Sequence, residues 1–227
     1  MKTANKRAKR LASTQKRTEK EKDGWIHLEV GGTPYEIGFA HGTLLRRHFP
    51  QVLKVLPFNV ARELKIPYAD YLRDCKRIFS PILDEEEWAF IKEELRGIVA
   101  GASTPGITYD FLVAWNSFLS MCTYYEKNHG SDHNSDHKDK GRCCAFIATG
   151  NATKTGEIVM AHNTHSDFST GFILNVIMKV YPKDNKSKGP NAFVMQTAPG
   201  LICSSSDWFL CENGIIGCCA PLQFHLF

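Results

Sequence analysis

Residues 141–168 read GRCCAFIATGNATKTGEIVMAHNTHSDF, and the chain changes character there. The polar run NHGSDHNSDHKDKGR (128–142) ends at this point, and an apolar strand pattern begins at once with Cys143 and Cys144. The turn-forming segment GNATKTG separates CCAFIAT from IVMAHN, so the stretch predicts a β-hairpin. The two cysteines therefore stand at the border between a linker and a strand, whereas a core cysteine normally lies inside its element.

The region before this border has helical periodicity. Thr33-Pro34-Tyr35-Glu36 matches a capping box with proline at the first helical position, and it is followed by an apolar stripe through residue 45. Pro and Gly residues punctuate the rest of the region into further segments. Helices are expected there at 50–64, 68–79, 84–102 and 108–122.

The region after the border has β character. Runs at 172–182 and 192–197 are separated by a polar turn, and Asn213-Gly214 is a hairpin signal within 208–219. The sequence therefore predicts an α+β protein in four parts. They are a basic disordered tail (1–23), a helical segment (24–125), an exposed polar linker (126–142) and a β-rich segment (143–227).

The charge of the chain is unevenly distributed. Of the net charge of +4, residues 1–22 contribute +7 through nine Lys or Arg and two Glu, which leaves −3 for the remainder. A mildly acidic body does not predict nucleic-acid binding. No secretory signal and no apolar span of about 18 residues is present, so we expect no membrane span and, by default, a cytoplasmic location.

Two features raise the question of metal binding. The eight cysteines include no C-x-x-C pair, so reduced thiols are expected rather than a structural zinc site or a disulfide framework. Histidines recur at four-residue spacing in the linker with aspartates between them, but the intervening Gly, Ser and Asn are poor helix formers. We therefore predict a solvated linker with no metal. The residues concerned are His129, His133 and His137 with Asp132, Asp136 and Asp139.

The border has one economical chemical interpretation. If the bond between Arg142 and Cys143 is cut, Cys143 carries both a thiol and a free α-amino group. Such an amine has a pKa of about 7.7–8.0 and can accept the thiol proton, so nucleophile and base come together. The alternative is that Cys143 and Cys144 are two small hydrophobic residues of a strand.

Five stretches in this order resemble one known family. Together they cover most of residues 24–217, and they are similar to the acyl-coenzyme A:6-aminopenicillanate acyltransferase-like family (peptidase family C45 type). That family belongs to the N-terminal nucleophile (Ntn) hydrolases and is related to phospholipase B-like proteins. The stretches are GGTPYEIGFAHG (31–42), EELRGIVAGA (93–102), ITYDFLVAWNS (107–117), CCAFIATGNATKTGEIVMAHNTHSDF (143–168) and TAPGLICSSSDWFLCENGIIG (197–217).

The resemblance implies an αββα sandwich of antiparallel sheets behind a helical prosegment. It also implies autocatalytic cleavage before Cys143, which matches the family's nucleophile, while Cys144 matches a position often occupied by Ser. Two positions depart from the pattern. Arg142 stands at the cleavage position where some relatives have another residue, and His165 stands where many have tryptophan.

Four further residues become candidates for the site. His162 and Asn163 end the strand expected to pair with the nucleophile strand, where they would orient the substrate or polarise its carbonyl. A structural histidine and an Asx-turn are the respective alternatives. Asp167 and Asp207 are candidates for holding the new α-amino group, and the alternative for both is a loop cap.

The implied reaction is acyl transfer from a small-molecule amide or ester through a thioester on Cys143, resolved by water or an amine. No cofactor is needed, because the nucleophile carries its own base. A phospholipase B-like lipid acyl hydrolase with the same nucleophile and a truncated, non-catalytic protein are the alternatives.

The number of residues after the border leads to one more expectation. The segment 143–227 holds 85 residues, too few for a whole sandwich, so we expect an incomplete second sheet. We then expect FILNVIMKV (172–180) and AFVMQT (192–197) to expose apolar surface, low stability, and a partner chain or self-association.

Overall fold

The computed structural model describes residues 18–128, 143–164, 168–173, 175–183, 192–204 and 208–218. The fold is α+β, as predicted. Helices predominate among the described residues up to 128, and strands predominate among the described residues from 143 onward. The helical elements are α2 (Pro34–Leu44), η1 (Arg46–His48), α3 (Phe49–Asn59), the π-helical turn η2 (Val60–Leu64), α4 (Tyr68–Asp84), η3 (Glu86–Trp88), α5 (Ala89–Ala102), α6 (Tyr109–Asn116), α7 (Phe118–Asn128) and α8 (Phe168–Gly171).

The strands form a six-stranded sheet and a separate two-stranded hairpin. The large sheet has the order β1-β2-β5-β6-β7-β8, and the hairpin consists of β3 and β4. All described pairings are antiparallel except β2 with β5, which is parallel. The strands are β1 (Thr18–Lys22), β2 (Trp25–Gly32), β3 (Cys144–Gly150), β4 (Gly156–Asn163), β5 (Val176–Pro182), β6 (Phe193–Thr197), β7 (Trp208–Cys211) and β8 (Ile216–Cys218).

The first two strands correct the sequence-based picture. Residues 18–22, predicted to belong to a disordered tail, form β1 and pair with β2. β2 was not predicted at all, and it lies in the middle of the sheet beside β5. The large sheet therefore contains strands from both sides of the border at residue 142.

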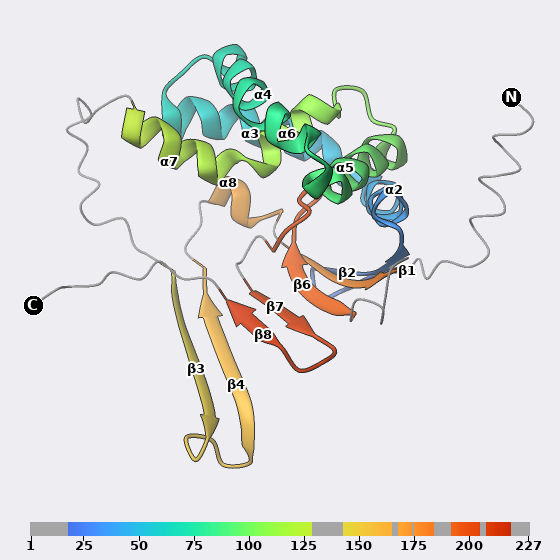
Figure 1. The fold of residues 1–227 in the computed structure, drawn as a ribbon, viewed down its shortest axis with the longest axis vertical. Coiled ribbons are helices and arrows are strands. Elements are labelled where there is room, and N and C mark those ends of the chain that lie inside the picture. The colour runs from blue at the N-terminus through green and yellow to red at the C-terminus, as the bar shows by residue number, and fades with distance from the viewer. Residues whose placement is uncertain are drawn as a thin grey trace, which may run out of the picture.

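Helices cover one face of the large sheet (Figure 1). Alternate residues of β2, β5 and β6 point into a single core shared with these helices. The prediction that β5 and β6 expose apolar surface is wrong for one face, because Val176, Met178, Val180 and Met195 are at most 4% exposed. The other face of these two strands carries Ile177, Lys179, Val194 and Gln196, which are half-buried.

The two helices α2 and α5 pack unusually closely through glycines. Thr33 begins α2 as predicted, since its hydroxyl oxygen accepts from Glu36 N–H and its own N–H donates to the Glu36 carboxylate at 2.9 Å. A methyl group added at Gly38 would lie 2.0 Å from the Glu94 carbonyl oxygen, and one added at Gly97 would lie 2.2 Å from the Tyr35 carbonyl oxygen. Gly42 and Gly101 face the partner backbone in the same way. Only glycine permits this approach.

Side chains of α2 and α6 hold the loop that follows β6. Gly200 N–H donates to His41 Nε2 at 2.9 Å, and Trp115 Nε1–H donates to the Pro199 carbonyl at 3.1 Å. Asn116 both donates to the Gly200 carbonyl, at 2.8 Å, and accepts from Ile202 N–H, at 3.0 Å. Three side chains thus fix the loop backbone at Pro199, Gly200 and Ile202.

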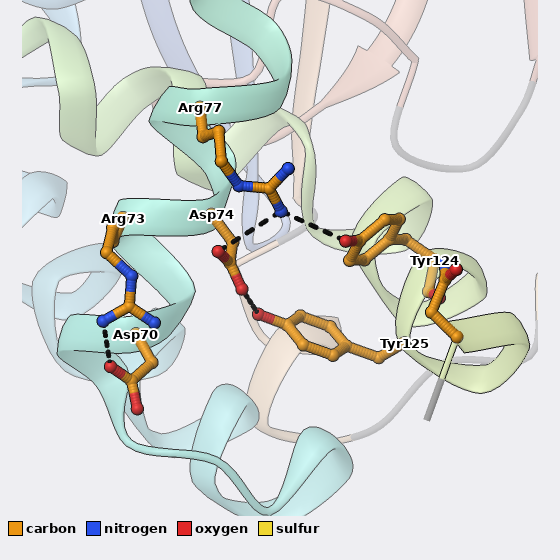
Figure 2. Close-up of polar contacts among 7 residues, drawn as sticks. Asp70, Arg73, Asp74, Arg77, Tyr124 and Tyr125 are labelled. Atoms are coloured by element: carbon orange, nitrogen blue, oxygen red, sulfur yellow. Dashed lines mark hydrogen bonds and ion pairs between the residues drawn. The ribbon is translucent and has the colours of Figure 1, made fainter. Parts of the chain in front are cut away.

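A polar network joins α4 to α7, the last helix before the linker (Figure 2). The Tyr125 hydroxyl donates to Asp74 at 2.6 Å, and the Arg77 guanidinium contacts both Asp74, at 3.4 Å, and the Tyr124 hydroxyl, at 3.1 Å. The hydrogen bond from Tyr125 is the main reason that the pKa of Asp74 is lowered. The network fixes α7 on α4.

Candidate functional site

The candidate nucleophile lies at the base of a hairpin that projects away from the helical layer (Figure 1). β3 and β4 pair as the sequence predicts, with Cys144 opposite Asn163 and Ala145 opposite His162. Cys143 directly precedes β3 and is half-buried. Extending the register by one residue places Cys143 opposite Thr164.

The alternation of side chains along a strand divides these residues between two faces. Cys143 shares its face with Ala145, and therefore with His162 and Thr164 on the facing strand. Diagonal neighbours on one face of an antiparallel pair are about 7 Å apart, which leaves room for a substrate carbonyl between Cys143 and His162. His162 and Cys143 therefore lie on the same face of the hairpin.

Thr164 was not identified from the sequence, yet it belongs to the same face. The Thr164 hydroxyl lies 3.1 Å from His162 Nδ1, a contact that orients the imidazole ring. Thr164 and His162 are both half-buried. The hairpin register is the signal that would have found Thr164, because it directly faces the residue before β3.

Asn163 falls on the opposite face of the hairpin from Cys143. It is exposed and pairs with Cys144, which is exposed as well. Within the hairpin, Asn163 is therefore placed to act on a group near Cys144 rather than near Cys143. The structure separates two candidates that the sequence had grouped together.

Several predicted site residues lie outside the described residues. These are Arg142 at the expected cleavage position, Asp167, Asp207, and His165 together with the histidine-rich linker. The chain on both sides of Asp207 is described. Trp208 N–H donates to the Ser204 hydroxyl at 3.0 Å, and Trp208 Nε1–H lies 3.4 Å from Gln196 Oε1. The two ends of the segment that contains Asp207 are thus joined.

A buried amide ties α8 to α3. The Asn59 side chain is 2% exposed, and its amide nitrogen donates to Thr170 Oγ1 at 2.9 Å. Its amide oxygen accepts from the Ser169 hydroxyl at 2.8 Å. Neither α8 nor this tie was predicted, since the contacts span 110 and 111 residues of sequence.

One group of described side chains has spacing that would suit a metal ion. Glu19, Glu21 and His48 bring their ligand atoms within 4.8 Å of one another. The Arg47 guanidinium already occupies this position, at 2.8 Å from Glu19 and 2.5 Å from Glu21, and it donates to His48 Nε2 at 3.1 Å. The positive charge beside these two carboxylates is therefore that of Arg47.

Comparison with known proteins adds one relative. No family model matches the chain. An uncharacterized protein of Archaeoglobus fulgidus is 25% identical over 183 residues. The alignment covers 78% of this chain but 29% of the archaeal protein, so the chain matches less than a third of that protein's length.

Crossing a bilayer takes a helix that is both long and apolar. No helix in the parts of the chain that the structure describes meets both conditions.

Proposed function

We propose that the chain is a self-processing cysteine N-terminal nucleophile acyltransferase or amidohydrolase of the C45 type, with Cys143 as its nucleophile. The observation that carries the proposal is the hairpin register. It puts Cys143, at the first position before β3, on one face with the oriented pair of His162 and Thr164.

The proposed chemistry proceeds in three steps. Cleavage before Cys143 frees its α-amino group, which accepts the thiol proton as the sulfur attacks an amide or ester carbonyl. The tetrahedral oxyanion is stabilised by N–H donors and collapses to a thioester as the amine or alcohol leaves with a proton. Water or a second amine then attacks the thioester and restores the thiol.

His162 has a defined part in this scheme. Its Nδ1 is engaged by the Thr164 hydroxyl, so the imidazole ring is held on the Cys143 face. If Nδ1 accepts from that hydroxyl, Nε2 carries the proton and can donate to the oxyanion. Thr164 then acts by fixing the tautomer as well as the orientation of the ring.

The αββα sandwich belongs to the proposal, and two features support it. The large sheet has helices on one face, as an outer layer of such a sandwich requires. The hairpin carries apolar side chains on both faces, with Phe146 and Val159 on one and Ile147 and Ile158 on the other, each about half exposed. Strands of this pattern are typical of a sheet that is covered on both sides.

Intact-mass spectrometry of the purified chain tests the proposal without knowledge of the substrate. We expect two fragments, of residues 1–142 and 143–227. They should co-purify under native conditions, because β2 and β5 pair across the cleavage point. A single uncut species that hydrolyses an activated ester would remove the free-amine mechanism. An uncut species without such activity would favour the non-catalytic alternative.

A further inference from the structure

The hairpin that carries Cys143 is connected to the body of the protein by two segments of very different length. Cys143 follows α7 after 15 residue steps, which can extend over about 50 Å. Thr164, at the base of β4, precedes α8 by four residue steps, which extend over at most about 14 Å. The base of β4 is therefore limited to within about 14 Å of the start of α8.

α8 itself packs little against the core, which the chain re-enters at Ile173, two residues after the helix ends. It comprises four residues, and Phe168 at its start is 98% exposed. Its half-buried Ser169 and Thr170 hydroxyls both bond to the amide of Asn59. Asn59 belongs to α3, whose Phe49, Val52 and Leu56 are fully buried in the core.

The local geometry of α3 changes immediately after Asn59. The helix continues into the π-helical turn η2, which ends where Lys65 adopts a left-handed conformation with φ 54°. A π-helical turn is rare and is frequently found at functional sites. Replacing the Asn59 amide would leave α8 with hydroxyl groups that water can satisfy, and among the described residues it would remove the hydrogen bonds that link α8 to α3.

We propose that Asn59 is a positioning residue, which holds α8 and thereby fixes the base of β4, with His162 and Thr164, against the helical layer. The inference rests on the proposed function only in taking Cys143 as the group that must be positioned. It assigns a part in the site to a residue more than 80 positions before the nucleophile.

The test compares wild type with Asn59→Ala by two readouts that need no substrate. The first is hydrogen exchange at Phe172 and Ile173, whose N–H groups bond back to Phe168 and Thr170. The second is the alkylation rate of Cys143 by iodoacetamide, followed by peptide mapping. We expect exchange at least 10-fold faster and alkylation at least 3-fold faster, with amides of α2 and α5 unchanged.

Two further variants keep the test decisive. Tyr71→Phe is the matched control, because it also deletes a hydrogen bond of a buried side chain, to the Ala114 carbonyl at 2.6 Å, but has no link to α8. The double variant Ser169→Ala/Thr170→Val removes the same bonds from the other side and decides the question if Asn59→Ala does not fold. Exchange and alkylation within twofold of wild type in the double variant would overturn the inference, as would equal changes in Tyr71→Phe.

The functional readout separates this inference from the proposed function. If the protein cleaves before Cys143, Asn59→Ala should slow that cleavage at least 10-fold and Tyr71→Phe should not. If wild type never cleaves while exchange and alkylation change as expected, the proposed function fails and the positioning role stands.

Discussion

The helix pair α2–α5 and the hairpin β3–β4 contain three of the stretches on which the proposed C45 assignment rests, yet they differ in how they are packed. The helix pair places glycines directly on the partner backbone, and its buried residues belong to the core. The hairpin exposes large apolar side chains on both faces in the described structure. The two stretches in the helix pair therefore build a scaffold, whereas the one stretch in the hairpin carries the candidate site.

The largest effect is expected at the glycine contacts. Gly38→Ala should cost about 3 kcal/mol or more of unfolding free energy, because the new methyl group meets the Glu94 carbonyl and the helices must separate. Helix propensity alone would favour alanine by about 1 kcal/mol, so a loss identifies the contact. Gly171→Ala is the control, since nothing lies within 4 Å of the added carbon. Equal unfolding midpoints in denaturant would show that the helices are not held this closely.

The next effect is expected at His41, which lies between Gly38 and Gly42 in α2. Complete burial lowers the pKa of His41 from 6.5 to about 4, because desolvation disfavours the charged ring. Between these pH values the unfolded chain binds the proton and the folded chain does not. Stability should therefore be full above pH 6.5 and fall by about 3 kcal/mol as the pH drops to about 4.

Denaturant unfolding at several pH values measures this loss. His41→Gln retains an acceptor for Gly200 N–H without a titrating group, so it should flatten the curve across that window. A wild-type curve that is already flat in this pH range would mean that solvent reaches His41. The hydrogen bond from Gly200 N–H to His41, which holds the loop after β6, would then be broken.

A smaller effect of opposite sign is expected at Glu94. Desolvation raises the pKa of this carboxyl to about 8, and among the described residues no cation pairs with it. Its ionisation thus opposes folding as the pH rises from 4.5 towards 8. Glu94 keeps partial contact with solvent, so Glu94→Gln should stabilise the protein by about 1–2 kcal/mol at pH 8 and by little at pH 4. Thermal unfolding at the two pH values checks this, and a loss of stability at pH 8 would point to an unrecognised partner.

The smallest change in unfolding free energy is expected in the hairpin, at Ile147. Ile147→Thr should change the unfolding free energy by no more than about 0.5 kcal/mol, because Ile147 is 52% exposed and threonine keeps the strand propensity. Ile98→Thr, at a fully buried position of α5, should cost about 2–4 kcal/mol. Should Ile147→Thr cost more than about 1 kcal/mol, the hairpin face is covered in solution, and sedimentation would then show whether a second chain covers it.

Local signals predicted much of this fold. The capping box at Thr33, the helix start at Thr108 and the hairpin turn between β3 and β4 each depend on residues close in sequence, and all three are present. β2 shows alternating Ile26, Leu28 and Val30, but its partner β5 lies about 150 residues away in a parallel register. No local sequence pattern predicts a parallel pairing between strands so far apart in the chain.

The candidate site was predictable in part for the same reason. The alternation of side chains in a hairpin puts His162 on the Cys143 face and Asn163 on the other, but only a fixed register decides which residue is which. The roles of His41 and Asn59 depend on contacts across 159 and about 110 residues, respectively. A buried polar residue becomes recognisable only when its partners are known.

The most direct test of the account compares the two adjacent cysteines. Wild type, Cys143→Ala and Cys144→Ser are incubated in parallel, and mass spectrometry follows cleavage before residue 143 and acylation by p-nitrophenyl acetate. We expect Cys143→Ala to lose both reactions and Cys144→Ser to keep both within about threefold, since a serine on the opposite face leaves the nucleophile and His162 in place. Cleavage or acylation that survives in Cys143→Ala and disappears in Cys144→Ser would contradict this expectation, and would assign the nucleophile to the face shared with Asn163.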